Sequence, residues 1–197
     1  MNCKFEIFNR IITNNSPTLI IAEIGINHLG KEELCEDMIL SAIEAGADCV
    51  KLQTGNIEES FYPNTISYKT FKDTELSKDS LLKLSKLANN NGSYLFSSPG
   101  DISSLNILRS IKSQAYKISS GQLTNIPIIT EMIKDNIPII FSTGMAKEED
   151  IKKIINLCKN NNFSNFAFLQ CVSLYPTSYK QLNLEYIKHL NENYNII

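Results

Sequence analysis

The sequence predicts an α/β fold: an incomplete (β/α)8 barrel of the TIM type, with about six of its eight strands and a short N-terminal β-ribbon. Two observations predict it. Short apolar runs alternate with amphipathic helical patterns, which is typical of parallel strands joined by right-handed crossover helices. Polar residues also follow many of these runs, and a barrel brings the ends of all its strands to one mouth.

The strands are expected in the following order. An alternating stretch at residues 5–12 predicts the ribbon, at the bottom of the barrel. A complete barrel takes about 250 residues. This chain has 197, and Ile196 and Ile197 resemble the opening of a seventh strand. The runs that predict parallel strands are residues 19–24, 49–52, 94–96, 115–118, 139–141 and 166–171.

Between these runs, apolar residues recur at helical spacing and predict the faces that pack on the sheet. The polar and aromatic residues 54–78 instead predict an extended loop at the top of the barrel. The three clearest apolar stripes are Leu34, Met38, Ala42 and Ala45; Leu81, Leu84 and Ala88; and Ile151, Ile154, Ile155 and Cys158.

Composition excludes several classes of function. The net charge of -2 provides no basic field for nucleic acid or an anionic membrane. No signal-peptide core and no run of about 18 apolar residues is present. The five cysteines lack paired or metal-type spacing, and Cys49 and Cys171 lie in apolar runs, so we expect buried thiols. The sequence therefore predicts a cytoplasmic protein without nucleic-acid or membrane partners.

An open, doubly wound sheet is the alternative architecture for this pattern. No G-x-G-x-x-G or Walker loop follows the first apolar run, which weakens the nucleotide-binding versions of that fold. An open sheet would also spread the polar strand ends along an edge, whereas a barrel gathers them around one site. The barrel is therefore favoured.

Two lysines within apolar runs, Lys51 and Lys117, are the sharpest chemical feature. Strands of a parallel sheet are normally apolar throughout, and a buried ammonium is costly to desolvate unless an anion meets it. Both lysines at one barrel mouth would form a pocket for a small, multiply charged anion. The structural alternative is that each lysine pairs with a core carboxylate, with Glu23 the obvious candidate.

A lysine in a barrel strand also suits a Schiff-base aldolase, in which Lys51 or Lys117 would be the nucleophile. Small hydroxyl residues at three successive strand ends weigh against it, because hydroxyls and loop N–H groups hold phosphate and carboxylate oxygens. Their structural alternative is helix capping. The three clusters are Ser97-Ser98-Pro99, Ser119-Ser120-Gly121 and Ser142-Thr143-Gly144.

Six motifs in order resemble those of the sialic acid synthase family, over nearly the whole chain. The first, Ile21-Ala22-Glu23-Ile24-Gly25-Ile26-Asn27-His28-Leu29-Gly30, resembles the family's first signature, and Ala45-Gly46-Ala47-Asp48-Cys49-Val50-Lys51-Leu52-Gln53-Thr54 its second. The others are Phe96-Ser97-Ser98-Pro99, Tyr116-Lys117-Ile118-Ser119-Ser120-Gly121, Ser142-Thr143-Gly144-Met145 and Cys171-Val172-Ser173-Leu174-Tyr175-Pro176.

This resemblance implies condensation of phosphoenolpyruvate with an open-chain N-acetylated amino-sugar aldehyde, which makes a nonulosonic acid and releases phosphate. It implies that Glu23 lies by the reacting carbons, and that Gln53 and Tyr175 face the sugar. The residues that would surround phosphoenolpyruvate are Lys51, Ser98, Lys117, Ser120, Ser142 and Ser173. Gln122 stands where the family usually has a sugar-binding Glu, so the resemblance leaves the particular sugar open.

The family also uses a divalent metal, Mn2+ or Mg2+, that polarises the aldehyde. Its metal-binding histidines lie in a later segment, and His28 and His189 do not replace them. We therefore expect residues 1–197 to be a C-terminally truncated phosphoenolpyruvate-binding barrel domain that lacks the metal ligands. The small C-terminal antifreeze-like domain, through which the family usually forms homodimers, would also be missing. Low activity and poor stability alone are expected, and a binding subunit completed by a separate polypeptide is the remaining alternative.

Overall fold

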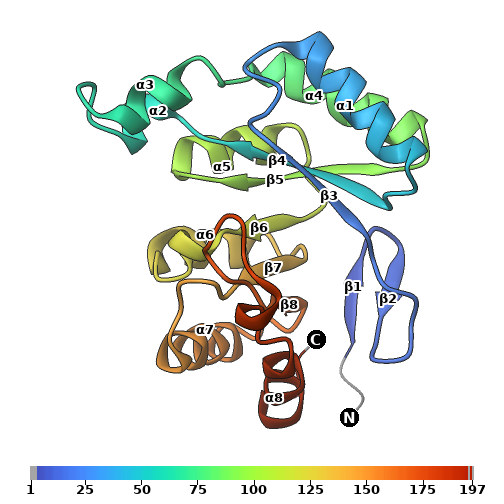
Figure 1. The fold of residues 1–197 in the computed structure, drawn as a ribbon, viewed down its shortest axis with the longest axis vertical. Helices are drawn as coiled ribbons and strands as arrows, with labels where there is room; N and C mark the ends of the chain where they lie inside the picture. The colour runs from blue at the N-terminus through green and yellow to red at the C-terminus, as the bar shows by residue number, and fades with distance from the viewer. Residues whose placement is uncertain (1–3, 195, 197) are drawn as a thin grey trace. The chain divides into compact units, whose positions relative to one another are not determined.

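The computed structural model describes residues 4–194 and 196, so Cys3 and Ile197 lie outside the described residues. The chain divides into two compact units. One is continuous, Leu19–Ser113, and the other combines Met1–Thr18 with Gln114–Ile197. Each unit carries three parallel strands that pair in chain order, with helices between them (Figure 1).

The continuous unit is built on three parallel strands, β3 (Ile21–Gly25), β4 (Cys49–Thr54) and β5 (Tyr94–Pro99). Helices α1 and α4 lie side by side on this sheet (Figure 1). Its helices are α1 (Glu32–Glu44), α2 (Ile57–Ser60), α3 (Ile66–Lys72), α4 (Lys78–Asn90) and α5 (Ile102–Ser110).

The second unit holds the ribbon and the later strands. The ribbon is antiparallel, β1 (Phe5–Ile7) with β2 (Arg10–Ile12), as predicted. Its parallel strands are β6 (Tyr116–Ile118), β7 (Ile139–Ser142) and β8 (Phe166–Leu169). Its helices are η1 (Ser120–Gln122), α6 (Ile126–Lys134), α7 (Glu148–Asn160), η2 (Tyr179–Gln181) and α8 (Glu185–Tyr194).

For two of the three helices with a predicted apolar stripe, α4 and α7, the structure buries that stripe. All residues of the predicted stripe are buried in both helices. The opposite face of each helix carries charged and Asn side chains, so only the apolar face packs on the sheet. Ser77 caps α4 by accepting a hydrogen bond from the Ser80 N–H, and Gly92 follows the helix with φ +74°, a conformation that suits glycine.

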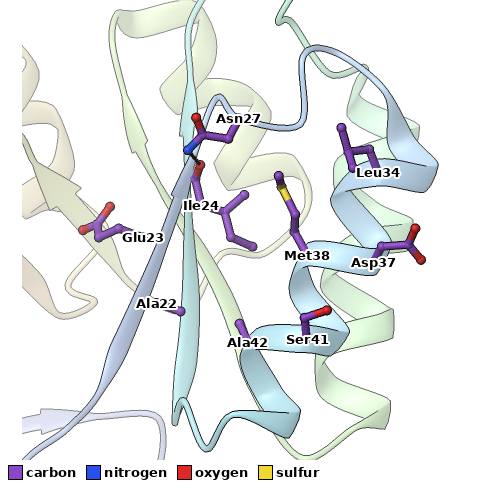
Figure 2. Close-up of a pocket in the computed structure, with 9 residues that line it drawn as sticks. All are labelled: Ala22, Glu23, Ile24, Asn27, Leu34, Asp37, Met38, Ser41 and Ala42. Atoms are coloured by element: carbon purple, nitrogen blue, oxygen red, sulfur yellow. Dashed lines mark hydrogen bonds between the residues drawn. The ribbon is translucent and has the colours of Figure 1, made fainter.

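The predicted buried face of α1 is wrong. Cys35 and Ile39 are its buried residues. The predicted positions Leu34, Met38 and Ala42 are half-buried and line an open hollow of about 500 Å3 against Ala22 and Ile24 of β3 (Figure 2). Helix α1 has apolar residues on two adjacent stripes, and contact with β4 and α4 selects the other one.

The predicted loop at residues 54–78 contains two short helices, α2 and α3. Asn56 and Thr65 start them, because each side chain accepts a hydrogen bond from a backbone N–H of the first turn. This segment, the excursion (residues 55–77), is fixed at its base. Asp101 accepts hydrogen bonds from the Asn56 N–H and the Ser60 hydroxyl, and Glu75 accepts one from the Ile57 N–H.

The sixth predicted strand is shorter than expected. β8 ends at Leu169, so Cys171 lies after the strand and is half-buried. The expectation of a buried thiol is therefore wrong for Cys171, although Cys49 at the start of β4 is fully buried. Among the described residues, no helix is long and apolar enough to cross a lipid bilayer.

Candidate functional site

The first candidate group, the Lys51 cluster (Glu23, Lys51 and Ser98), lies in the continuous unit. Lys51 is 4% exposed, and its Nζ lies 2.9 Å from Glu23 Oε2. The same nitrogen donates to Ser98 Oγ at 3.2 Å and to the Leu52 carbonyl at 3.3 Å. These three partners match the three N–H donors of an ammonium group.

The strand register brings these residues together. Glu23 on β3 lies opposite Lys51 on β4, so their side chains share one face of the sheet. Figure 2 shows Ile24 turned toward α1 and Glu23 turned away from it. The hollow between α1 and β3 therefore lies on the face of the sheet opposite to the Glu23 carboxylate. About half of the Glu23 side chain (54%) is exposed, so its carboxylate can move into solvent and break the ion pair with Lys51.

Lys51 therefore has the carboxylate partner that the structural alternative named. This partner is nevertheless a half-exposed carboxylate, whereas that alternative expected a core carboxylate. Gln53 is exposed on β4, opposite Ser98 of β5 in the register. Among the residues that the structure describes, the hydrogen bonds of the Lys51 cluster do not include the Gln53 side chain.

The second group, the Lys117 cluster (Lys117, Ser120, Ser142, Gly144 and Ser173), lies in the discontinuous unit. Lys117 is 5% exposed, and its Nζ donates to Ser142 Oγ and, at 3.1 Å, to the Ile118 carbonyl. The Gly144 N–H donates to Ser120 Oγ at 3.0 Å. The cluster thus combines a buried cation with three hydroxyls and a backbone donor.

Gly144 makes this gathering possible. A Cβ at this position would lie 2.8 Å from both Ser120 Oγ and Ser173 Oγ, closer than real Cβ contacts. Both hydroxyls are therefore packed against the bare α-carbon. Because any side chain at Gly144 would push them apart, the glycine is a spatial requirement of the Lys117 cluster.

The two lysines share one local geometry. Lys51 lies opposite Phe96 in the register, and its serine, Ser98, is two residues further along β5. Lys117 lies opposite Ile140, and Ser142 is two residues further along β7. Each Nζ also donates to the carbonyl of the next residue in its own strand. A lysine that leans toward the carboxyl end of the sheet reaches both groups.

Two predicted sugar-facing residues remain apart from these clusters in their recorded contacts. Tyr175 is 95% exposed. Gln122 is half-buried in η1, and its side-chain carbonyl accepts a hydrogen bond from Asn125 Nδ2 at 2.8 Å. Sequence reasoning missed Gly144 and Cys171, although both lie within motifs that it quoted. The signal for Gly144 was its place directly after two hydroxyl residues.

The residues that the structure describes do not fit the divalent metal that the resemblance implies. Nowhere among them do three His, Cys, Asp or Glu side chains gather as ligands. His28 is fully buried, and burial lowers the pKa of its imidazole. Its Nδ1 accepts a hydrogen bond from the Gly30 N–H, so that nitrogen is already used within the loop. His189 lies on α8, with Nε2 3.6 Å from Glu148.

Known proteins resemble this chain over most of its length. A model of the NeuB family matches residues 38–197. The chain belongs to the NeuB family. Relatives include the N,N'-diacetyllegionaminic acid synthase of Legionella pneumophila, 32% identical over 90% of this chain. The N-acetylneuraminate-9-phosphate synthase of Homo sapiens is likewise 32% identical over 90% of it.

Among solved structures, the N-acetylneuraminic acid synthetase of Leptospira borgpetersenii serovar Hardjo-bovis, in complex with citrate, matches the whole chain. The TM-score is 0.93, the identity is 32%, and the match covers 68% of that protein. This likeness confirms the predicted fold class: α/β, an incomplete TIM-type barrel with six parallel strands in the described residues and an N-terminal ribbon. The chain spans 55% and 53% of the two synthases named above, about half of each.

Proposed function

We propose that this NeuB-family chain contributes to the condensation of phosphoenolpyruvate with an open-chain N-acetylated amino sugar. The observation that carries the proposal is the repeated lysine geometry. Two ammonium groups, each about 5% exposed, donate to serine hydroxyls near the ends of parallel strands. Phosphoenolpyruvate carries a phosphate and a carboxylate, and cationic and hydroxyl donors of this kind bind both groups.

In this reaction C3 of phosphoenolpyruvate forms a bond with the aldehyde carbon, a water molecule adds at C2, and the C2–O bond to the phosphate group breaks as phosphate leaves. We assign anion binding to Lys51, Lys117, Ser98, Ser120, Ser142 and Ser173. Glu23 is assigned to the reacting end, where its carboxylate would accept a hydrogen bond from the sugar or from the attacking water. The described residues do not form a metal site, so the roles assigned here are those of protein side chains.

The amino sugar is proposed to be a diacetamido sugar rather than N-acetylmannosamine. Gln122 replaces the carboxylate that the resemblance expects, and an amide cannot accept two strong hydrogen bonds from hydroxyls as a carboxylate can. The Legionella pneumophila relative is a synthase of N,N'-diacetyllegionaminic acid, a product with two acetamido groups. Gln53 and Tyr175 are assigned to the sugar as well.

Calorimetric titration with phosphoenolpyruvate tests the proposal first, followed by a phosphate-release assay with phosphoenolpyruvate and each amino sugar. Binding is expected of residues 1–197, and sugar-dependent phosphate release is expected of a version extended by the segment that carries the family's metal-binding histidines. The Schiff-base alternative gives a different result: borohydride with pyruvate would trap an imine at Lys51 or Lys117. Trapping of such an adduct, or titration without any binding, would contradict the proposed function.

A further inference from the structure

Cys171 stands apart from the other described cysteines. It follows β8 by two residues and is half-buried, whereas Cys35, Cys49 and Cys158 are fully buried. Its Sγ donates a hydrogen bond to Ser142 Oγ at 3.4 Å, an ordinary length for a sulfur donor. Its Cβ lies 3.1 Å from where a Gly144 Cβ would be, so the thiol borders the Lys117 cluster.

The hydrogen bonds around Ser142 determine where its proton points. A serine hydroxyl has two acceptor lone pairs and one O–H donor. Lys117 Nζ donates to Ser142 Oγ, and Cys171 Sγ donates to the same oxygen. Because both lone pairs are then occupied, the Ser142 O–H must be directed away from Lys117 and Cys171, toward a third group that can accept.

We propose that Cys171 is a positioning residue that, together with Lys117, fixes Ser142 as a hydrogen-bond donor to an anionic oxygen of the ligand. This inference rests on the proposed function, since the anion is phosphoenolpyruvate or its phosphate group. Cys171 acts through Ser142. A bound anion at the Lys117 cluster covers the half-exposed thiol, so ligand occupancy changes its accessibility.

A thiol suits this role because it is a weak donor with a long reach. Alanine at position 171 would leave one lone pair of Ser142 empty. The hydroxyl could then rotate, and the preference for donating toward the ligand would be lost. Cys171→Ser keeps a hydrogen-bond donor at this position, although the C–O bond is shorter than the C–S bond. The series Cys, Ser, Ala therefore separates hydrogen bonding from packing.

Thiol labelling of the full chain provides the first test. Iodoacetamide forms a carbon–sulfur bond at the thiolate, iodide leaves, and the proton goes to buffer, so each modified cysteine is identified by its mass. Burial raises the pKa of Cys35 and of Cys158 to about 12, so both serve as internal controls that stay unlabelled while the chain is folded. Cys171 should react, and saturating phosphoenolpyruvate or inorganic phosphate should slow its labelling at least about fivefold.

A double-mutant cycle provides the second test. Cys171→Ala should weaken phosphoenolpyruvate binding about 3- to 10-fold, the usual value of one hydrogen bond, and Cys171→Ser should restore most of it. In the Ser142→Ala background, Cys171→Ala should have little further effect, because the hydroxyl that it positions is gone. A purely structural role predicts additive losses instead.

The outcomes separate this inference from the function it rests on. If calorimetry shows binding but saturating ligand leaves the labelling rate of Cys171 unchanged, or if the two substitutions are additive, the role of Cys171 is refuted and the proposed function stands. If the wild-type chain binds neither phosphoenolpyruvate nor phosphate, the proposed function itself fails. Protection together with non-additivity supports both.

Discussion

The Lys51 cluster and the Lys117 cluster repeat one backbone geometry, yet they surround the ammonium group with different chemistry. Lys51 pairs with the half-exposed carboxylate of Glu23, and it donates to one serine. Lys117 instead donates to the neutral Ser142 hydroxyl, and two more hydroxyls, those of Ser120 and Ser173, pack against the bare α-carbon of Gly144. The strand register places each lysine beside a serine. The remaining group of the first cluster, Glu23, comes from β3, and those of the second come from the segments that follow β6, β7 and β8.

This difference has a consequence for ligand binding. An anion that approaches Lys51 must displace the Glu23 carboxylate, because all three donors of the ammonium are already used. An anion at the Lys117 cluster instead meets neutral hydroxyls, of which Ser142 already accepts from Lys117 and Cys171. We therefore expect Glu23 to limit anion affinity at the first cluster and the spacing around Gly144 to limit it at the second.

Loss of either lysine should have the largest effect. Lys51→Ala and Lys117→Ala should each weaken phosphoenolpyruvate binding by about 2 kcal/mol or more, which is roughly 30-fold, because each removes a desolvated cation. Calorimetric titration measures this. Lys83→Ala is the matched control, since Lys83 is an exposed lysine whose ion pair with Glu32 lies at the surface. Unchanged affinity in both cluster variants would reject the assignment of the lysines to anion binding.

A side chain at position 144 should have the next largest effect. Gly144→Ala places a Cβ 2.8 Å from two serine hydroxyls, so we expect a loss of about 1–3 kcal/mol in the free energy of unfolding and weaker phosphate binding. Gly121→Ala is the control in the same unit, because its Cβ would meet only Met145 Sδ at 3.8 Å. Thermal unfolding and phosphate titration measure the two effects. Equal behaviour of the two variants would show that the hydroxyl spacing is unimportant.

Neutralising Glu23 should change affinity in the opposite direction. Glu23→Gln removes the carboxylate that competes for Lys51, so phosphoenolpyruvate should bind about 3- to 10-fold more tightly at low salt. Condensation should be lost, because the assigned acceptor is gone. Glu44→Gln, at the exposed C-terminal end of α1, makes the same change in net charge and should leave affinity as it was. Weaker binding in Glu23→Gln would show that the carboxylate supports the site rather than limits it.

The smallest effect is expected at Gln122, whose side-chain carbonyl already accepts a hydrogen bond from Asn125 Nδ2. Gln122→Glu should shift turnover toward N-acetylmannosamine by about 10-fold or less, because a carboxylate accepts stronger hydrogen bonds from hydroxyls. Rates of phosphate release with each sugar measure the shift. A clear preference of the unaltered protein for N-acetylmannosamine would contradict the diacetamido assignment.

The lysines could be found from the sequence because a charged residue interrupts an otherwise apolar strand, and a strand has only two faces. The buried face of α1 could not be found, because apolar residues occupy two adjacent stripes and packing against β4 and α4 selects Cys35 and Ile39. The position of Cys171 was missed for a related reason. Its apolar run continues past Leu169, where strand pairing ends.

The short helices of the excursion depend on hydrogen bonds that no local pattern shows. Asp101 is remote in sequence from Asn56 and Ser60, yet it accepts hydrogen bonds from both. In the same way, the close approach of two serines to Gly144 joins the segments that follow three separate strands, β6, β7 and β8. The residue types at strand ends predicted which hydroxyl and ammonium groups the clusters contain. The distances between those groups could be known only from the folded structure.

The ribbon belongs to a unit whose other residues come much later in the chain, and this sets an order of events during synthesis. Asn165 holds the ribbon by accepting a hydrogen bond from the Glu6 N–H and donating one to the Glu6 carbonyl, across 159 positions of sequence. At about 5–20 residues per second, a ribosome needs on the order of ten seconds to make that stretch. The continuous unit, Leu19–Ser113, is complete before then. The ribbon therefore emerges well before its partner Asn165, and chaperones have that interval in which to bind it.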